Sequence, residues 1–183
     1  MKYLTLITGF LLWMYSSNAQ FRRISVDSSS SHFTYAIEQI GFGGNTLIFS
    51  LAYKPNSLFN NHKIKYVNEC SLEGGLLQIK KEVVDILKNH VAHLATKALK
   101  EKFQLSVKIL PKYDGEIADV WFHWAGTQRF FTEEEMDVLI NNISKIKIHF
   151  KESGCYNTSY CQCLTFGILI QDWEYILNSA KEN

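Results

Sequence analysis

Apolar residues recur along this chain at two different spacings, and the order of the two patterns limits the fold to a mixture of strands and helices. Residues 33–53 alternate between apolar and polar side chains on both sides of the glycine-rich segment 41–45, which predicts a β-hairpin. From 76 to about 102 the apolar residues instead recur every three or four positions, which predicts one long amphipathic helix.

Asp114-Gly115 is the strongest local turn signal, and it separates two further alternating runs. The first run covers 103–109 and the second covers 118–124, so together they predict a second hairpin. Because side chains alternate across a strand, the second strand should have one apolar face and one mixed face. The apolar face holds Ala118, Val120, Phe122 and Trp124, and the mixed face holds Asp119, Trp121 and His123.

Thr132 and Glu135 mark the start of a further helix, because they form the capping-box pattern and acidic residues fill the first turn. Alternation then predicts strands at 146–150 and within 161–170, and helical spacing predicts a short helix over 173–180. The elements predict an α+β fold, with one long and one or two shorter helices packed on an antiparallel sheet. The capped helix should bury Met136, Leu139, Ile140 and Ile143.

The N-terminus has the three-part layout of a secretory signal peptide over residues 1–19. Lys2 is followed by an apolar run over 3–14 and by a small polar stretch that ends at Ala19. An apolar run of about twelve residues is too short to span a bilayer. We therefore expect cleavage between Ala19 and Gln20 and a periplasmic or secreted mature chain without a transmembrane span; retention as an anchor is the alternative.

Composition limits the classes of partner. The 19 Lys and Arg residues nearly balance the 18 Asp and Glu residues, whereas nucleic-acid binding needs concentrated cationic charge, so we expect no nucleic-acid partner. The serine-rich stretch 20–31 predicts a flexible leader with little to bury. The apolar fraction of 46% suffices for residues 32–183 to form a single α+β domain.

The four cysteines, Cys70, Cys155, Cys161 and Cys163, all follow the predicted signal peptide. Exported proteins meet oxidising conditions, so an even number of cysteines first indicates disulfides. A turn over 156–160 would place Cys155 opposite Cys161, and Cys163 would then be able to reach Cys70. No C-x-x-C spacing favours zinc or a redox thiol, and we expect no metal and no cofactor.

Two groups of histidine-containing residues have competing interpretations. His90 falls within the apolar stripe of the long helix, so we interpret it as a core or interface histidine that does not bind metal with His93. Asp119, Trp121 and His123 would form a small binding surface if they are exposed. The alternative is that the N-terminal hairpin or the C-terminal helix covers them, because large aromatic side chains gain most from burial.

The segments LSVKI at 105–109, YDGEI at 113–117 and VWF at 120–122 form a strand, a D-G-x-I turn and a strand, before the capped helix. Over about 76–170 this order resembles the C-terminal domain of TonB-type energy transducers and related exported proteins of Bacteroidetes. The resemblance implies that fold and the acceptance of a partner's extended segment on an open sheet edge. With only two prolines, the chain lacks the Pro-rich segment of the transducers, so energy coupling is not expected.

These features favour a non-enzymatic binding or accessory module of the cell envelope that engages a protein partner, through an exposed sheet edge. A small secreted hydrolase, with a histidine and carboxylates from different segments, is the alternative from another class. A toxin-like or immunity-like exported factor is a third. A histidine beside an acid in a deep cleft would favour the hydrolase, whereas an unpaired strand edge would favour binding.

Overall fold

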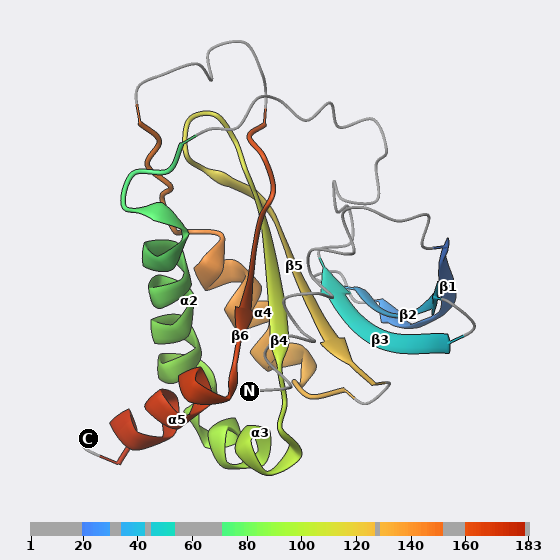
Figure 1. Cartoon of the computed structure of the whole chain (residues 1–183). Helices are drawn as coiled ribbons and strands as arrows, with labels where there is room; N and C mark the ends of the chain where they lie inside the picture. The colour runs from blue at the N-terminus through green and yellow to red at the C-terminus, as the bar shows by residue number, and fades with distance from the viewer. Residues whose placement is uncertain are drawn as a thin grey trace.

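Helices cover one face of a six-stranded antiparallel sheet in the computed structural model (Figure 1). The strand order is β1-β2-β3-β5-β4-β6, so the predicted α+β fold is confirmed. Within the described part of the chain, no helix has the length and apolar content needed to cross a membrane. The structure describes residues 20–29, 34–42, 45–53, 71–126, 129–151 and 160–181.

The elements follow the order that the sequence predicts, with three differences that are described below. The strands are β1 (Gln20–Ser29), β2 (Thr34–Phe42), β3 (Asn45–Tyr53), β4 (Leu105–Pro111), β5 (Ile117–Ala125) and β6 (Leu164–Ile168). The helices are α2 (Gly75–Val91), the 3-10 turn η2 (Ala92–Leu94), α3 (Ala95–Glu101), α4 (Glu133–Ile143) and α5 (Ile170–Ser179).

The core lies between the helices and one face of the sheet. Phe122 of β5 and Val107 of β4 are fully buried in it, together with the four residues that the sequence assigned to the buried side of α4. The capping box is present, since Glu135 N–H donates to the Thr132 hydroxyl and Thr132 N–H donates to the Glu135 carboxylate. Local patterns therefore predicted this helix and its orientation correctly.

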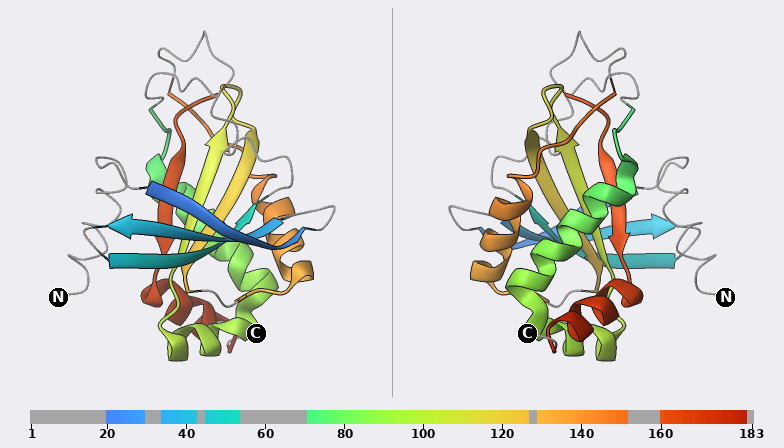
Figure 2. Two further views of the ribbon diagram at one scale, coloured as in Figure 1. Left: turned by 90° about the vertical axis from the view of Figure 1, so that its right-hand side faces the viewer. Right: turned by 90° about the vertical axis from the view of Figure 1, so that its left-hand side faces the viewer.

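Strands β1–β3 extend the sheet beyond β5. They cross β4–β6 at a large angle, on the face of the sheet away from the helices (Figure 2). The predicted hairpin is confirmed as β2 and β3, which pair from Thr34 with Tyr53 to Phe42 with Asn45. The predicted flexible leader is wrong over Gln20–Ser29, which pairs with β2 as strand β1. Main-chain hydrogen bonds need no apolar side chains, so composition did not indicate this strand.

The predicted long helix is broken rather than continuous. Val91, with φ −132° and ψ 23°, leaves the helical region, and η2 then redirects the chain into α3. Buried Ala95 and Ala98 mark the inward side of α3, which packs against α5. The apolar spacing continues through the break, so a pattern of three and four residues did not indicate it.

The predicted strand at 146–150 is wrong, although its side chains alternate as expected. Ile146 and Ile148 are buried while Lys147 and His149 are exposed, as are Lys145 and Lys151. The segment forms an extended connection whose main chain makes hydrogen bonds both to the turn at Gly115 and to the residues just before α2. Ile148 N–H donates to Gly115 O at 2.8 Å, and His149 O accepts from Glu73 N–H at 2.8 Å. Because no neighbouring strand runs along it in the described residues, it joins no sheet.

Gly115 has two reasons to be glycine. Its φ of +83° is in the left-handed region, and a Cβ at this position would lie 2.0 Å from Ile148 O. Gly126 has a similar φ of +90°, but a Cβ added there would meet no atom within 4 Å. Gly126 is therefore a matched control for the strain of the turn.

We expect Gly126→Ala to lower the free energy of unfolding by about 1 kcal/mol, the cost of a left-handed conformation. Gly115→Ala should lower it by at least about 3 kcal/mol, because the clash with a main-chain carbonyl adds to that cost. Urea unfolding of both variants measures the difference. Equal losses would contradict the contact between the turn and Ile148.

Candidate functional site

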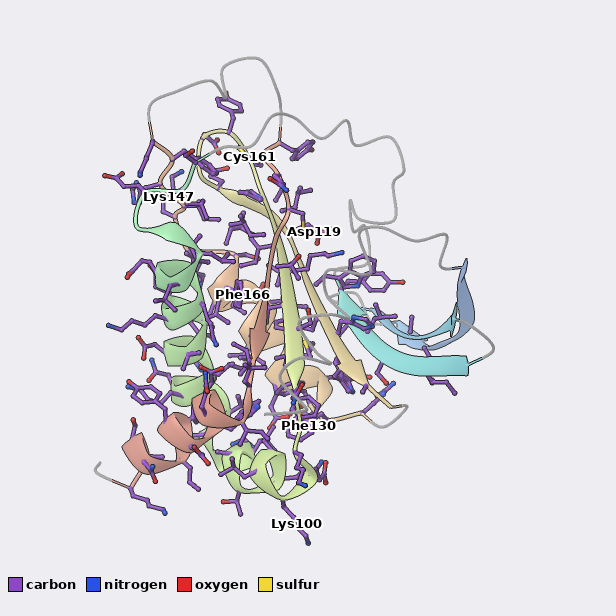
Figure 3. The ribbon with its side chains drawn as sticks, viewed as in Figure 1. Lys100, Asp119, Phe130, Lys147, Cys161 and Phe166 are labelled. Carbon is purple, nitrogen blue, oxygen red and sulfur yellow. The ribbon has the colours of Figure 1, made fainter. Side chains whose placement is uncertain are left out.

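The sequence-predicted group Asp119, Trp121 and His123 lies on one face of β5, opposite the helices. Figure 3 shows Asp119 on this side of the sheet and Phe166 of β6 on the other. The group is not an open surface, however, because Asp119 is only 1% exposed and Trp121 and His123 are half-buried. Asp119 Oδ1 accepts from Val120 N–H at 2.9 Å, which holds the carboxylate against its own strand.

Strand β3 of the N-terminal hairpin covers part of this face. The Tyr53 ring meets the Trp121 ring edge-on, with centroids 5.4 Å apart, and Leu51 and Tyr53 are themselves buried. From the other side, Lys108 Nζ lies 5.6 Å from the centroid of the Trp121 ring. Such contacts stabilise an aromatic side chain within the fold. Trp121 thus lies between two strands as part of the packing of the hairpin on β5.

His123 and Asp119 are poorly placed to act together. They are four residues apart on one strand, which corresponds to about 13 Å. Burial, and to a smaller extent the charge of Lys108, lowers the pKa of His123 from 6.5 to about 4. The imidazole is therefore neutral at pH 7 and, unlike a histidine of a His–Asp pair, is not poised to titrate near neutrality.

Two of the four predicted disulfide residues, Cys161 and Cys163, are described. Cys161 is buried and its N–H donates to Pro111 O at 2.8 Å, while Cys163 is half-buried just before β6. Burial raises the pKa of the Cys163 thiol from 9.0 to about 11, which disfavours a nucleophilic thiolate. Cys70 and Cys155 lie outside the described residues, so both disulfides stay predictions.

The two helical histidines do not share a site. His90 is exposed, which corrects the core position that its spacing predicted. His93 Nε2 lies 2.7 Å from Glu135 Oε1, and Glu135 also belongs to the capping box of α4, so this pair links η2 to α4. Among the described residues, no three His, Cys, Asp or Glu side chains converge as metal ligands would.

The two outer strands of the sheet differ in how well their edges are protected. Strand β1 has register irregularities between Arg23 and Ser25 and between Val26 and Ser28, and its sequence includes charged residues. Strand β6 pairs with β4 without an irregularity and has the sequence LTFGI, which contains neither charge nor proline. Bulges, charges and prolines are the usual means of blocking further strand pairing. Strand β6 is therefore the outer strand of the described sheet that lacks a charge, a proline and a bulge.

An open edge was expected from the sequence, but no strand could be assigned to it. The absence of charge and proline in LTFGI is visible in the sequence. The sequence does not show, however, that this strand is the outermost one, which only the strand order of the folded sheet shows. Buried Phe166 faces the helices beside Val107, and half-buried Thr165 lies beside Lys108 on the opposite face.

No protein-family model and no curated protein matches this chain. Among solved structures, the chain is similar to a DUF5043 family protein from Bacteroides uniformis, with a TM-score of 0.50 and 16% sequence identity. The match covers 83% of this chain and 92% of the other. At this identity the likeness concerns the fold alone. The resemblance to TonB-type C-terminal domains is not confirmed by these comparisons.

The lowered pKa of His123 predicts a specific pH dependence of stability. Between pH 6.5 and about 4 the unfolded chain binds a proton that the folded chain does not, so stability should fall as the pH falls through this window. The contribution is at most about 1.4 kcal/mol for each pH unit.

Urea unfolding at several pH values measures this slope. His123→Gln should reduce the loss of stability on going from pH 6.5 to 4.5, whereas His90→Gln at an exposed position should leave it unchanged. An unaltered slope in His123→Gln would show that this imidazole is accessible to protons in the folded state.

Proposed function

We propose that this chain is an exported, non-catalytic binding module that engages a protein partner through the edge of β6. The observation that carries the proposal is that LTFGI is the last strand of the described sheet, pairs with β4 on one side, and has no charge, proline or bulge. An outer strand offers unpaired N–H and C=O groups, and an extended segment can bind to it as an additional strand.

The signal-peptide layout of residues 1–19 supports export, and the even number of cysteines supports disulfide pairing in an oxidising compartment. The hydrolase alternative has less support. Its clearest candidates, His123 and Asp119, are separated along β5 by about 13 Å, and the pair formed by His93 and Glu135 serves the start of α4.

A photo-crosslinking amino acid placed at Thr165 tests the proposal in the producing cells. Thr165 is on β6, and the control position is Thr96, an exposed residue of α3. We expect a discrete adduct from position 165 and none from position 96. Mass spectrometry of the adduct should locate the crosslink in one continuous segment of the partner.

Equal labelling from both positions would contradict edge recognition, because it would indicate random encounter. Absence of any adduct from position 165, with protein that is folded and exported, would also overturn the proposal.

A further inference from the structure

The two outer strands of the described sheet limit how copies of this chain can associate. β1 contains Arg22, Arg23 and Asp27 and has two register irregularities. LTFGI of β6 has no charge, no proline and no irregularity. Charges and bulges on an outer strand prevent its pairing with another chain, and a strand without them is a template for such pairing. By this criterion a further strand can add at β6 and is blocked at β1.

The pattern of β6 matches itself in an antiparallel arrangement. Phe166 and Ile168 are buried in the core on the helix side, and Leu164 packs against the same core, whereas Thr165 and Gly167 alternate with them. A two-fold axis beside Phe166, perpendicular to the sheet, pairs Leu164 with Ile168 of the second copy and Thr165 with its Gly167. Apolar side chains then meet apolar side chains on the helix side, and no like charges on β6 oppose each other.

The first turn of α2 lies near the start of β6. The residues just before α2 bond to the connection 148–149, which also bonds to Gly115 in the β4–β5 turn. β6 begins at the same end of the sheet, because Leu164 pairs with Ile109 near the end of β4. Leu77 in this turn of α2 is 77% exposed. An apolar side chain is therefore exposed beside the start of β6.

A second exposed apolar side chain lies near the other end of β6. α5 starts directly after β6 and carries Tyr175, which is 47% exposed. Lys88 Nζ, in the last turn of α2, lies 5.8 Å from the Tyr175 ring centroid. Leu77 is on the same side of α2 as Lys88, because about three helical turns separate them. A two-fold axis at the centre of β6 would thus bring Leu77 of each copy toward Tyr175 of the other.

We infer that the partner at the edge of β6 is a second copy of this chain, joined by antiparallel pairing of the two β6 strands across a two-fold axis. This inference rests on the proposed function and identifies the partner. The pairing is closed, because it uses β6 of both copies and leaves β1 at each end of the continuous sheet. The product is a discrete dimer and not a growing fibre.

The size of this interface predicts a reversible dimer. The pairing covers the five residues of each β6 strand and the contacts of Leu77 and Tyr175. This is smaller than the interface of about 1,600 Å² that is typical of stable complexes. We therefore expect the dimer to form as the concentration rises. In dilute solution β6 remains paired with β4 alone.

Sedimentation velocity of the full chain over a concentration series tests the inference. We expect a reversible equilibrium between monomer and dimer, with no larger species. Thr165→Glu places a carboxylate on the pairing strand and should weaken association at least tenfold. Thr165→Val keeps the branched shape without a charge and should leave association unchanged. Thr96→Glu makes the same charge change on exposed α3 and should also have no effect.

A second variant tests the contact between the helices at a position where substitution does not disturb the core. Leu77→Ser should weaken the dimer at least threefold. The matched control is Val138→Ser, which removes an apolar side chain that is 36% exposed on α4, and it should leave the dimer unchanged. If Thr165→Glu and Leu77→Ser associate as strongly as the parent chain, the copies do not meet at β6 and the inference is wrong.

Crosslinking separates this inference from the proposed function. With a photo-crosslinking amino acid at Thr165 in an equal mixture of normal and heavy-isotope chains, we expect peptides that join the β6 strands of a normal and a heavy chain. A chain that is monomeric at every concentration, while position 165 captures a different protein in the producing cells, would overturn the inference and leave the proposed function intact. Absence of both self-association and capture would overturn both. Oligomers that grow beyond the dimer would contradict closure and overturn the inference.

Discussion

The β4–β5 hairpin is the unit on which the rest of the structure depends, because every other part of the sheet attaches to it. β5 pairs with β3 and so holds the N-terminal hairpin, while β4 pairs with β6. The turn of the β4–β5 hairpin also holds the connection that follows α4, because Gly115 O accepts a hydrogen bond from Ile148 N–H. The apolar face of the hairpin, with Val107, Ile109, Val120 and Phe122 all fully buried, provides the surface on which α2 and α4 pack.

The sequence predicted those elements whose signals are local. The alternation around Asp114-Gly115 and the Thr132–Glu135 box each specify geometry within a few residues, and both are present as predicted. Features set by distant parts of the chain were missed. Strand β1 exists because β2 offers it a partner, and 146–150 is no strand because its main chain bonds to Gly115 and Glu73 instead. The helix break at Val91 is likewise a tertiary effect, since α3 turns to pack on α5.

In the candidate site, too, the local features were predicted and those that depend on distant residues were not. Alternation correctly placed Asp119, Trp121 and His123 on one face of β5, but it gave no information on what covers that face. Tyr53 lies against Trp121, and Asp119 is buried, so this face contributes to packing more than to an open surface. The candidates for recognition lie elsewhere, at the uncharged outer strand β6 and at Leu76 and Leu77 of α2, which are 37% and 77% exposed.

Amide hydrogen exchange along β6 tests most directly whether this strand pairs on one side only. In an outer antiparallel strand, the N–H groups of alternate residues point to the neighbouring strand and the others point away from it. We predict that protection alternates along Leu164–Ile168, with strongly protected amides separated by rapidly exchanging ones. Uniform protection of all five residues would show that the edge is already occupied and would contradict one-sided pairing.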